Sequence, residues 1–306
     1  MDARDIDSLL EDAFAEVIGP ATPPRLHAAM RAAVFGGGGR LRPRIVVAVA
    51  EACGGADDDM AARAAAAIEF LHCASLVHDD LPCFDDATIR RGRPSVHAQF
   101  GVPLAVLAGD GLITAAFELL SRVPATPTLP ALLAVIARSV GACRGIVAGQ
   151  AWESEPSPNL RLYHRAKTGA LFEAAFGAGA LVGGGDVGRW QALGTRLGEA
   201  YQIADDLADR HGTEDALGKP TGQDSRLDRP NAVRELGTFA AKDRLRQLVA
   251  SLLDAVPDAP RREHFVGWLE AVCSRVLAPA DVPAAAAAPN DRREAPLVTT
   301  AAVLTI

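Results

Sequence analysis

Residues 61–85, AARAAAAIEFLHCASLVHDDLPCFD, are the stretch from which the fold can be read. The first part, 61–77, is apolar on most faces of a helix, which indicates a helix at the centre of a bundle and not on its surface. The stretch then ends in Asp79, Asp80 and Asp85, with Pro82 between them. Two carboxylates about 4 Å apart repel by roughly 4 kcal/mol at an effective dielectric near 20, so cations must offset this repulsion.

A second stretch repeats this design further along the chain. Residues 166–182 again read as a central apolar helix, and a later helix ends in 205–209, DDLAD. Asp205 and Asp209 are four residues apart, which places them on one helix face about 5–6 Å apart. In the first cluster Pro82 should end the helix and swing Asp85 back toward Asp79. Hard carboxylate oxygens in pairs, followed by arginine or lysine, favour Mg²⁺ and diphosphate as ligands.

The remaining sequence reads as helix throughout. Apolar residues at helical spacing predict a first helix that ends near Gly19, and no segment shows the alternation of a strand. We therefore predict an all-α fold, a helical bundle around a central apolar cavity, with a single domain over 1–278 and a low-complexity tail over 279–306 that is disordered. The further helices are expected at roughly 25–35, 43–53, 59–80, 102–121, 130–150, 160–182, 188–210, 238–256 and 260–277.

Composition and charge limit the partners and the location of the protein. The chain has 306 residues and a formal net charge of -7, which argues against nucleic acid because backbone phosphates need a basic face. Five cysteines form no C-x-x-C pair and mostly lie among apolar residues, so we expect buried, reduced thiols and a cytoplasmic location. The acidic start predicts no signal peptide, and every long apolar stretch is interrupted too early for a membrane span.

Six short motifs, in this order, resemble those of the trans-isoprenyl diphosphate synthases. They are 37–43 (GGGRLRP), 72–91 around the first aspartates, 108–110 (AGD), 167–169 (KTG), 201–206 (YQIADD) and 218–220 (GKP). The resemblance covers roughly residues 5–277. Residues 148–155 (AGQAWESE), 222–224 (GQD) and 229–233 (RPNAV) are most similar to the geranylgeranyl diphosphate synthases of bacterial carotenoid pathways.

The resemblance implies the activity and the roles of the site residues. Members of this family ionise an allylic diphosphate (dimethylallyl, geranyl or farnesyl) with the help of Mg²⁺, join it to isopentenyl diphosphate and release a proton. Two or three Mg²⁺ ions and a homodimer are expected. The implied roles are metal binding for Asp79, Asp80, Asp85, Asp205, Asp206 and Asp209, binding of the allylic diphosphate for Arg90, Lys167 and Lys219, binding of isopentenyl diphosphate for Gly39, Arg42, His72 and Arg91, and stabilisation of the carbocation for Thr168 and Gln202.

Product length and one departure from the pattern also follow from the resemblance. In the family, the residues four and five positions before the first aspartate form the floor of the chain cavity. Here they are Ser75 and Ala74, which are not aromatic, so a twenty-carbon product is predicted. Gly39 stands where the family usually has lysine, so one cationic contact is missing, and backbone N–H groups of the glycine run are expected to replace it.

Other interpretations stay open at this point. His72 could be a core histidine with its hydrogen bonds satisfied, Arg90 and Arg91 could lie in a solvated loop, and Thr168 could bond its own helix. The Glu-x-x-His sequence of Glu69 and His72 is also typical of di-iron bundles, although the chain has no second copy. A farnesyl diphosphate synthase, a terpene cyclase and a non-catalytic partner subunit are the alternatives on the same fold.

Overall fold

The computed structural model describes residues 6–55, 57–157, 159–211 and 231–281, and within these ranges the chain is a bundle of helices, as predicted. The helices are α1 Ile6–Val17, α2 Pro24–Phe35, α3 Leu41–Cys53, α4 Asp58–Asp79, α5 Val96–Phe100, α6 Val102–Ser121, α7 Leu129–Val140, α8 Ile146–Trp152, α9 Leu160–His164, α10 Ala170–Gly183, α11 Val187–His211, α14 Ala232–Leu236, α15 Thr238–Asp254 and α16 Arg262–Asp281. A π-helical turn, η1, occupies Arg165–Gly169 between α9 and α10.

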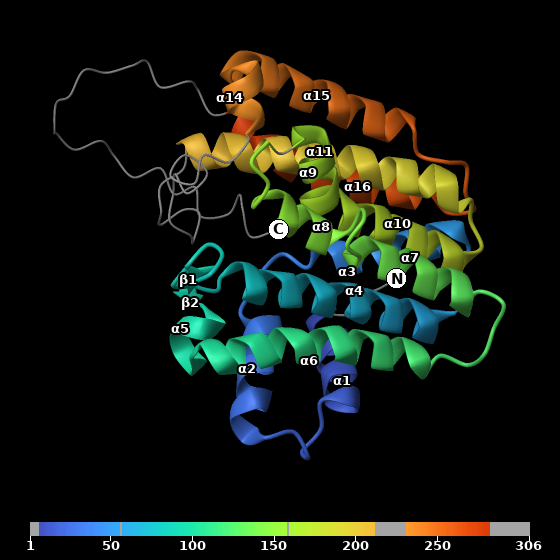
Figure 1. Cartoon of the computed structure of the whole chain (residues 1–306). Coiled ribbons are helices and arrows are strands. Elements are labelled where there is room, and N and C mark those ends of the chain that lie inside the picture. Colours follow the sequence, from blue (N-terminus) through green and yellow to red (C-terminus); the bar gives the residue numbers. More distant parts are fainter. Residues whose placement is uncertain (1–5, 56, 158, 212–230, 282–306) are drawn as a thin grey trace, which may run out of the picture.

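Helix α4 is the central element that the sequence predicts. Its N-terminus is capped by Asp57, whose side chain accepts a hydrogen bond of 2.9 Å from the backbone N–H of Met60. Alanine predominates in its middle, which favours helix and leaves room for close neighbours. The helix packs against α3, α6 and α10. Figure 1 shows α6, α4, α10, α11 and α15 lying side by side in that order.

The core fills the space between these helices. Its largest fully buried side chains are aromatic and come from elements spread along the chain: Phe14, Phe70, Phe172, Phe176, Trp190 and Phe265. The Trp190 and Phe265 rings meet edge to face with centroids 4.9 Å apart, which joins α11 to α16. Helix α16 continues to Asp281, past the expected start of the tail at 279, and Ala280 is buried.

Several details differ from the sequence-based expectation, and the short helices α5 and α14 are among the elements that were not predicted. The single helix expected at 130–150 is divided into α7 and α8, because the chain leaves helical geometry at Gly141 and resumes it after Gly145. A short antiparallel hairpin, β1 (Ile89–Arg90) and β2 (Arg93–Pro94), was not expected. Its turn places Arg91 and Gly92 at φ of 54° and 72°, the left-handed pair typical of a tight hairpin.

Among the described residues, two helices are by length and composition alone long and apolar enough to cross a membrane. In the most apolar 18-residue window of each, 78% of α4 is buried inside the protein and 44% of α6. Helix α4 therefore has the burial of a core helix, whereas α6 keeps part of its apolar surface exposed.

The five cysteines are free. Cys73 and Cys273 are buried and Cys53 is half-buried, whereas Cys83 and Cys143 are exposed, so the expectation of burial is wrong for the last two.

Candidate active site

The first aspartate cluster lies where α4 ends. The helix finishes at Asp79, and the turn that follows contains Pro82, which has no backbone N–H to donate. The backbone N–H of Asp85 donates a hydrogen bond of 2.9 Å to the carbonyl oxygen of Asp79. The turn therefore brings Asp85 back to Asp79, as the sequence predicts.

A third carboxylate joins these two. Asp79, Asp85 and Glu153 each offer one oxygen, and the three oxygens all lie within 4.8 Å of one another. Glu153 follows the last residue of α8. No role for Glu153 was predicted from the sequence, where its only signal is its place in the run 148–155. A donor set made of carboxylate oxygens, without sulfur or imidazole, fits a hard divalent cation such as Mg²⁺.

Lys167 reaches this cluster from η1. Its ammonium group lies 3.3 Å from Oδ1 of Asp79 and donates to Oε1 of Glu153, which also accepts a hydrogen bond of 2.7 Å from the hydroxyl of Tyr163. Helix α8 approaches η1 closely because residue 149 is glycine: a Cβ there would lie 2.4 Å from Cα of Lys167. A π-helical turn inserted in a regular helix is frequent at functional sites. Lys167 is thus a half-buried cation held between two carboxylates of the candidate metal site.

The second aspartate cluster approaches η1 from α11. The hydroxyl of Thr168 donates to Oε1 of Gln202, and Nε2 of Gln202 donates to Oδ1 of Asp206 over 2.8 Å. Asp206 is buried, and Asp205 and Asp209 are half-buried on the same helix. Lys167 contacts the first cluster and the adjacent Thr168 contacts α11 through Gln202. The two clusters, far apart in the sequence, therefore converge on one helical turn.

Asp80 and Arg90 form an ion pair beside the first cluster. Nε of Arg90 lies 2.9 Å from Oδ1 of Asp80, whose side chain is almost fully buried. Burial raises the pKa of Asp80, and the positive charge of Arg90 opposes that rise. Arg90 comes from β1, so the hairpin that the sequence did not reveal is what aims this guanidinium at the end of α4.

His72 and Arg42 form a second polar site; His72 lies about two turns before Asp79 on α4, and Arg42 lies on α3. Nη1 of Arg42 lies 3.3 Å from Nε2 of His72, and the Arg42 guanidinium stacks on the Phe172 ring at 4.6 Å. Burial, reinforced by the neighbouring guanidinium groups, holds the pKa of His72 well below its usual 6.5, so the imidazole is neutral. Because arginine can only donate, Nε2 must accept and Nδ1 must carry the proton.

Two donors of this site are unsatisfied. Nδ1 of His72 and Nε of Arg42 are both buried, and neither has a hydrogen-bond partner among the described residues. An unsatisfied buried donor costs about 1–3 kcal/mol, so such groups usually have a ligand or water. Both atoms are donors beside positive charge, which makes an anion the fitting ligand.

Arg91 connects this site to the glycine run. Its Nη1 donates to the carbonyl oxygen of Gly37, and its Nη2 lies 3.5 Å from Nε2 of His72. A Cβ at Gly38 would lie 2.5 Å from Cζ of Arg91, so only glycine allows this contact. Gly39 lies in the same loop just before Arg40. The structure thus gathers Arg42, His72, Arg91 and the loop of Gly39, the four residues expected to act together.

The remaining predicted residues have simpler placements. Ala74 and Ser75 are buried on α4, with exposed fractions of 1% and 7%. The hydroxyl of Ser75 donates to the carbonyl oxygen of His72 over 2.7 Å. Lys219 lies outside the described residues, as do 218–220 and 222–224.

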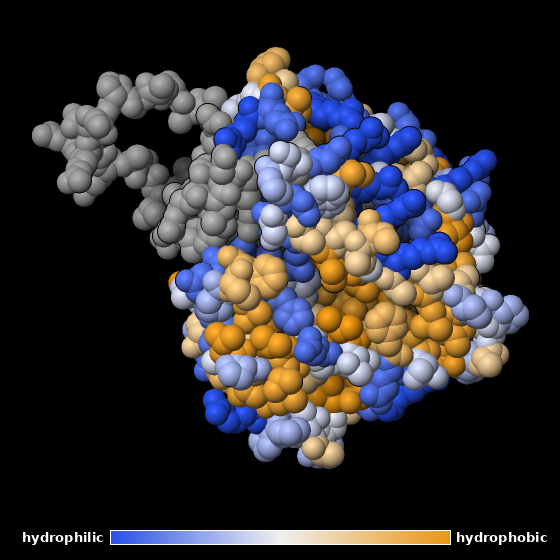
Figure 2. All heavy atoms as spheres, viewed as in Figure 1, coloured by the Kyte–Doolittle hydropathy of each residue, from blue (hydrophilic) through white to orange (hydrophobic). Residues whose placement is uncertain are grey.

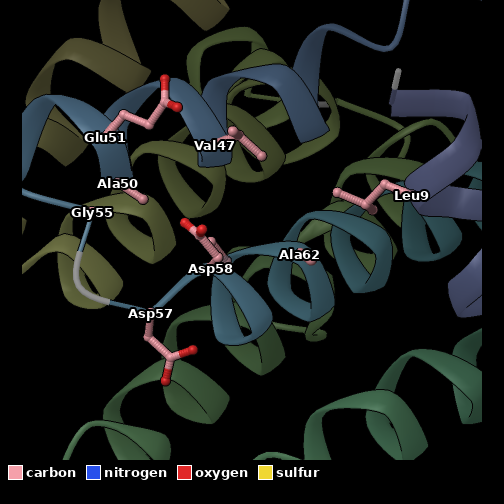
Figure 3. Close-up of a pocket in the computed structure, with 9 residues that line it drawn as sticks. Leu9, Val47, Ala50, Glu51, Gly55, Asp57, Asp58 and Ala62 are labelled. Atoms are coloured by element: carbon pink, nitrogen blue, oxygen red, sulfur yellow. The ribbon is translucent and has the colours of Figure 1, made fainter. Parts of the chain in front are cut away.

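Two pockets in the described part of the chain contain none of the carboxylates of the first cluster. Figure 3 shows a small one between α3 and the start of α4, lined by Glu51, Asp57 and Asp58 among others. Asp58 begins α4 and Asp79 ends it, so the pocket lies a full helix length, about 30 Å, from the metal-site candidates. A cavity of 830 Å³ lies between η1, α11 and α15 and borders Gln202, but Asp79, Asp85, Glu153 and Lys167 are not among its lining residues.

Comparison with known proteins gives consistent matches. Residues 23–257 match the family model described as polyprenyl synthetase. The chain is 46% identical over 281 residues to geranylgeranyl diphosphate synthase of Cereibacter sphaeroides, covering 91% of this chain and 97% of that protein. It is 38% identical over 237 residues to farnesyl diphosphate synthase of Geobacillus stearothermophilus, covering 73% and 79%.

A solved structure with a similar fold is a geranyltransferase from Helicobacter pylori, in complex with magnesium and isoprenyl diphosphate. The TM-score is 0.75 at 29% identity, over 88% of this chain and 96% of that one. The family model spans all the residues of the candidate site, from the glycine run to α11.

Proposed function

This chain belongs to the polyprenyl synthetase family, and on that premise we propose that it condenses isopentenyl diphosphate with allylic diphosphates to give geranylgeranyl diphosphate. It is a prenyltransferase, like the relatives and the solved structure that it resembles. The observation that carries the proposal is the convergence of two aspartate clusters on the turn that bears Lys167 and Thr168.

The reaction requires a highly charged leaving group to depart. The C–O bond between the allylic carbon and diphosphate breaks, a C–C bond forms to the double bond of isopentenyl diphosphate, and one proton is lost. When bound, Mg²⁺ neutralises the charge that develops on the departing diphosphate. We propose two or three ions held by Asp79, Asp85 and Asp205, with support from Asp80, Asp206 and Asp209, and we add Glu153 to this set because of its place in the cluster.

Lys167 and Arg90 are the proposed groups for the allylic diphosphate, together with Lys219 outside the described residues. Both described cations already lie against carboxylates of the first cluster, at Asp79 and Asp80. This contact keeps them next to the metal site, where the diphosphate would replace carboxylate oxygens as their partner. Thr168 on η1 and Gln202 on α11 are joined by a hydrogen bond, and the oxygen atoms of both side chains are proposed to stabilise the allylic cation.

Isopentenyl diphosphate is proposed to bind at Arg42, His72, Arg91 and the loop of Gly39. The support is the pair of unsatisfied donors, Nδ1 of His72 and Nε of Arg42. This site uses fixed cationic and neutral donors and no carboxylate, so its diphosphate would not be activated to leave. That difference supports the proposal that the two substrates bind at two separate sites.

The twenty-carbon product is supported by the small side chains before the first cluster. Ala74 and Ser75 are buried, so a larger side chain at either position would project into the packed interior and shorten the space for the product. Farnesyl diphosphate remains the alternative end product, since one relative is a farnesyl diphosphate synthase.

A homodimer through α6 is also proposed. Val102, Val106 and Leu107 on this helix have exposed fractions of 42%, 37% and 52%. Figure 2 shows apolar residues gathered over the lower half of the molecule in this view, where Figure 1 places α6. Covering this face with a second copy would remove apolar surface from water. A reducing, cytoplasmic location is proposed because the five cysteines are free.

One experiment tests the activity and the product together. The purified chain is incubated with isopentenyl diphosphate and Mg²⁺ plus dimethylallyl, geranyl or farnesyl diphosphate, and products are identified by mass. We expect the same C20 product from all three starters. A C15 end product would reject the assigned length, and failure to consume isopentenyl diphosphate would reject the activity.

Matched variants test the metal site in the same assay. Asp85→Asn should abolish turnover because it removes one carboxylate of the cluster. Asp59→Asn makes the same change at the opposite, exposed end of α4 and should leave turnover intact. If the chain consumes isopentenyl diphosphate only with a partner, or only alters a partner's product, a non-catalytic subunit is the better description.

A further inference from the structure

Glu69 is a buried acid that none of the sites above uses. It lies on α4, one turn before His72, with an exposed fraction of 2%. Its Oε1 accepts a hydrogen bond of 2.9 Å from Nη1 of Arg40. The glutamate of the Glu-x-x-His sequence is thus paired with an arginine.

Arg40 joins three parts of the chain. Its Nη1 bonds Glu69 on α4, and its Nε bonds Oδ1 of Asp7 on α1, also at 2.9 Å. Its backbone immediately follows the glycine run and takes the left-handed conformation, with φ of 55° and ψ of 32°. A side chain other than glycine rarely adopts this conformation unless its surroundings impose it. Arg40, Glu69 and Asp7 are called the arginine clamp below.

We propose that the arginine clamp is a positioning device for the isopentenyl diphosphate site, an inference that rests on the proposed function of Arg42, His72 and Arg91. Arg40 and Arg42 flank Leu41 at the start of α3, and Glu69 and His72 lie one turn apart on α4. Glu69 holds Arg40 while His72 contacts Arg42. The start of α3 is therefore attached to α4 at two points, Arg40–Glu69 and Arg42–His72. The position of the first contact determines the position of the second.

The arginine clamp also affects the position of Arg91, the second guanidinium group of the site. Arg91 donates to the carbonyl oxygen of Gly37 and packs under Gly38, within three residues of Arg40. A displacement of Arg40 moves this loop, and with it the partner of Arg91. Both guanidinium groups proposed to bind isopentenyl diphosphate thus depend on one buried ion pair, whereas Lys167 and Arg90 are held by other contacts.

The first test is Glu69→Gln, which keeps the shape of the side chain and removes its charge. We expect KM for isopentenyl diphosphate to rise about tenfold or more, which is the effect of losing one well-placed charge-assisted hydrogen bond. KM for the allylic substrate should change less than about twofold. The control is Glu16→Gln. Glu16 pairs with Arg63 at 2.7 Å and also joins α1 to α4, but near the opposite end of α4. It should leave both KM values within about twofold.

A second variant separates position from stability. Arg40→Met with Glu69→Met replaces the buried ion pair by apolar side chains of similar volume, which often preserves stability. We expect its Tm to match the wild type while KM for isopentenyl diphosphate stays raised. If Glu69→Gln does not fold, this double variant tests the proposal in its place.

Several outcomes would overturn the proposal. One is an unchanged KM for isopentenyl diphosphate in a folded variant. Another is a fall in kcat together with a rise in KM for both substrates, in proportion to the fall in Tm. Calorimetric titration of isopentenyl diphosphate into wild type and variants gives Kd without turnover. If wild type binds and turns over this substrate but the variants match it, only the clamp proposal fails. If wild type does neither, the proposed function fails first.

Discussion

Replacing Glu153 by glutamine tests the least expected member of the candidate metal site. The carboxylate is one of three that converge within 4.8 Å, and it accepts hydrogen bonds from Lys167 and Tyr163. Glutamine keeps the length and one acceptor oxygen but removes the negative charge. The change therefore weakens both a metal ligand and the ion pair that holds Lys167.

The size of the effect follows from the exposure of the pair. The side chains of Lys167 and Glu153 are 22% and 9% exposed, so solvent screens their attraction only in part. A hydrogen bond to a charged group contributes about 1.5–3 kcal/mol, and partial exposure favours the lower half of that range. A loss of about 2 kcal/mol in transition-state binding corresponds to a roughly 30-fold fall in kcat/KM.

The assay is steady-state turnover with the allylic substrate varied, repeated over a range of Mg²⁺ concentrations. Glu153→Gln should lower kcat/KM and shift the Mg²⁺ dependence to higher concentration. Glu155→Gln is the matched control, because Glu155 lies two residues further on, is exposed and is not part of the cluster. Wild-type kcat/KM and an unshifted Mg²⁺ dependence in Glu153→Gln would refute the role given to this residue.

Three further changes test the floor, the histidine and the dimer. Ala74→Phe adds a ring to a position that is 1% exposed and should shorten the main product from C20 to C15 by mass; an unchanged product would move the floor to another helix. Since the folded pKa of His72 lies below the usual 6.5, its contribution to stability is present above about pH 6.5 and is lost as pH falls, so Tm should drop less on acidification in His72→Gln than in wild type. A similar drop in both would contradict the burial of a neutral imidazole. Leu107→Glu, on the exposed face of α6, should convert a dimer into a chain of 31.9 kDa in light scattering, and a dimer that survives this change would place the interface elsewhere.

Local sequence signals predicted most of the long helices and the shape of the first cluster, but not the short helices α5 and α14. The apolar run 61–77 gave α4 nearly to its ends, and Pro82 correctly predicted the turn that returns Asp85 to Asp79. These features depend on residues close together in the sequence, where periodicity and backbone chemistry decide. The hairpin at β1 and β2 escaped detection because two-residue strands are too short to alternate.

The contacts between side chains of the site could not be predicted from local sequence signals. Glu153 meets Asp79 only because Gly149 lets α8 approach η1, and Glu69 meets Arg40 only because α3 packs on α4. Such pairs depend on how helices pack, which a single sequence does not specify. Motif resemblance did supply Lys167, Thr168 and Gln202. The structure places Lys167 and Thr168 on η1 and Gln202 on α11, with a hydrogen bond between Thr168 and Gln202.

The extra residue carried by η1 makes the chain between α9 and α10 sensitive to length. Each residue of a regular helix turns the chain by about 100°, so deleting one from 165–169 would restore ordinary winding yet rotate everything on one side of it. Either Lys167 would leave the carboxylates, or the buried face of α10 would turn out of the core. A one-residue deletion in this segment would therefore disrupt either the active site or the packing of α10.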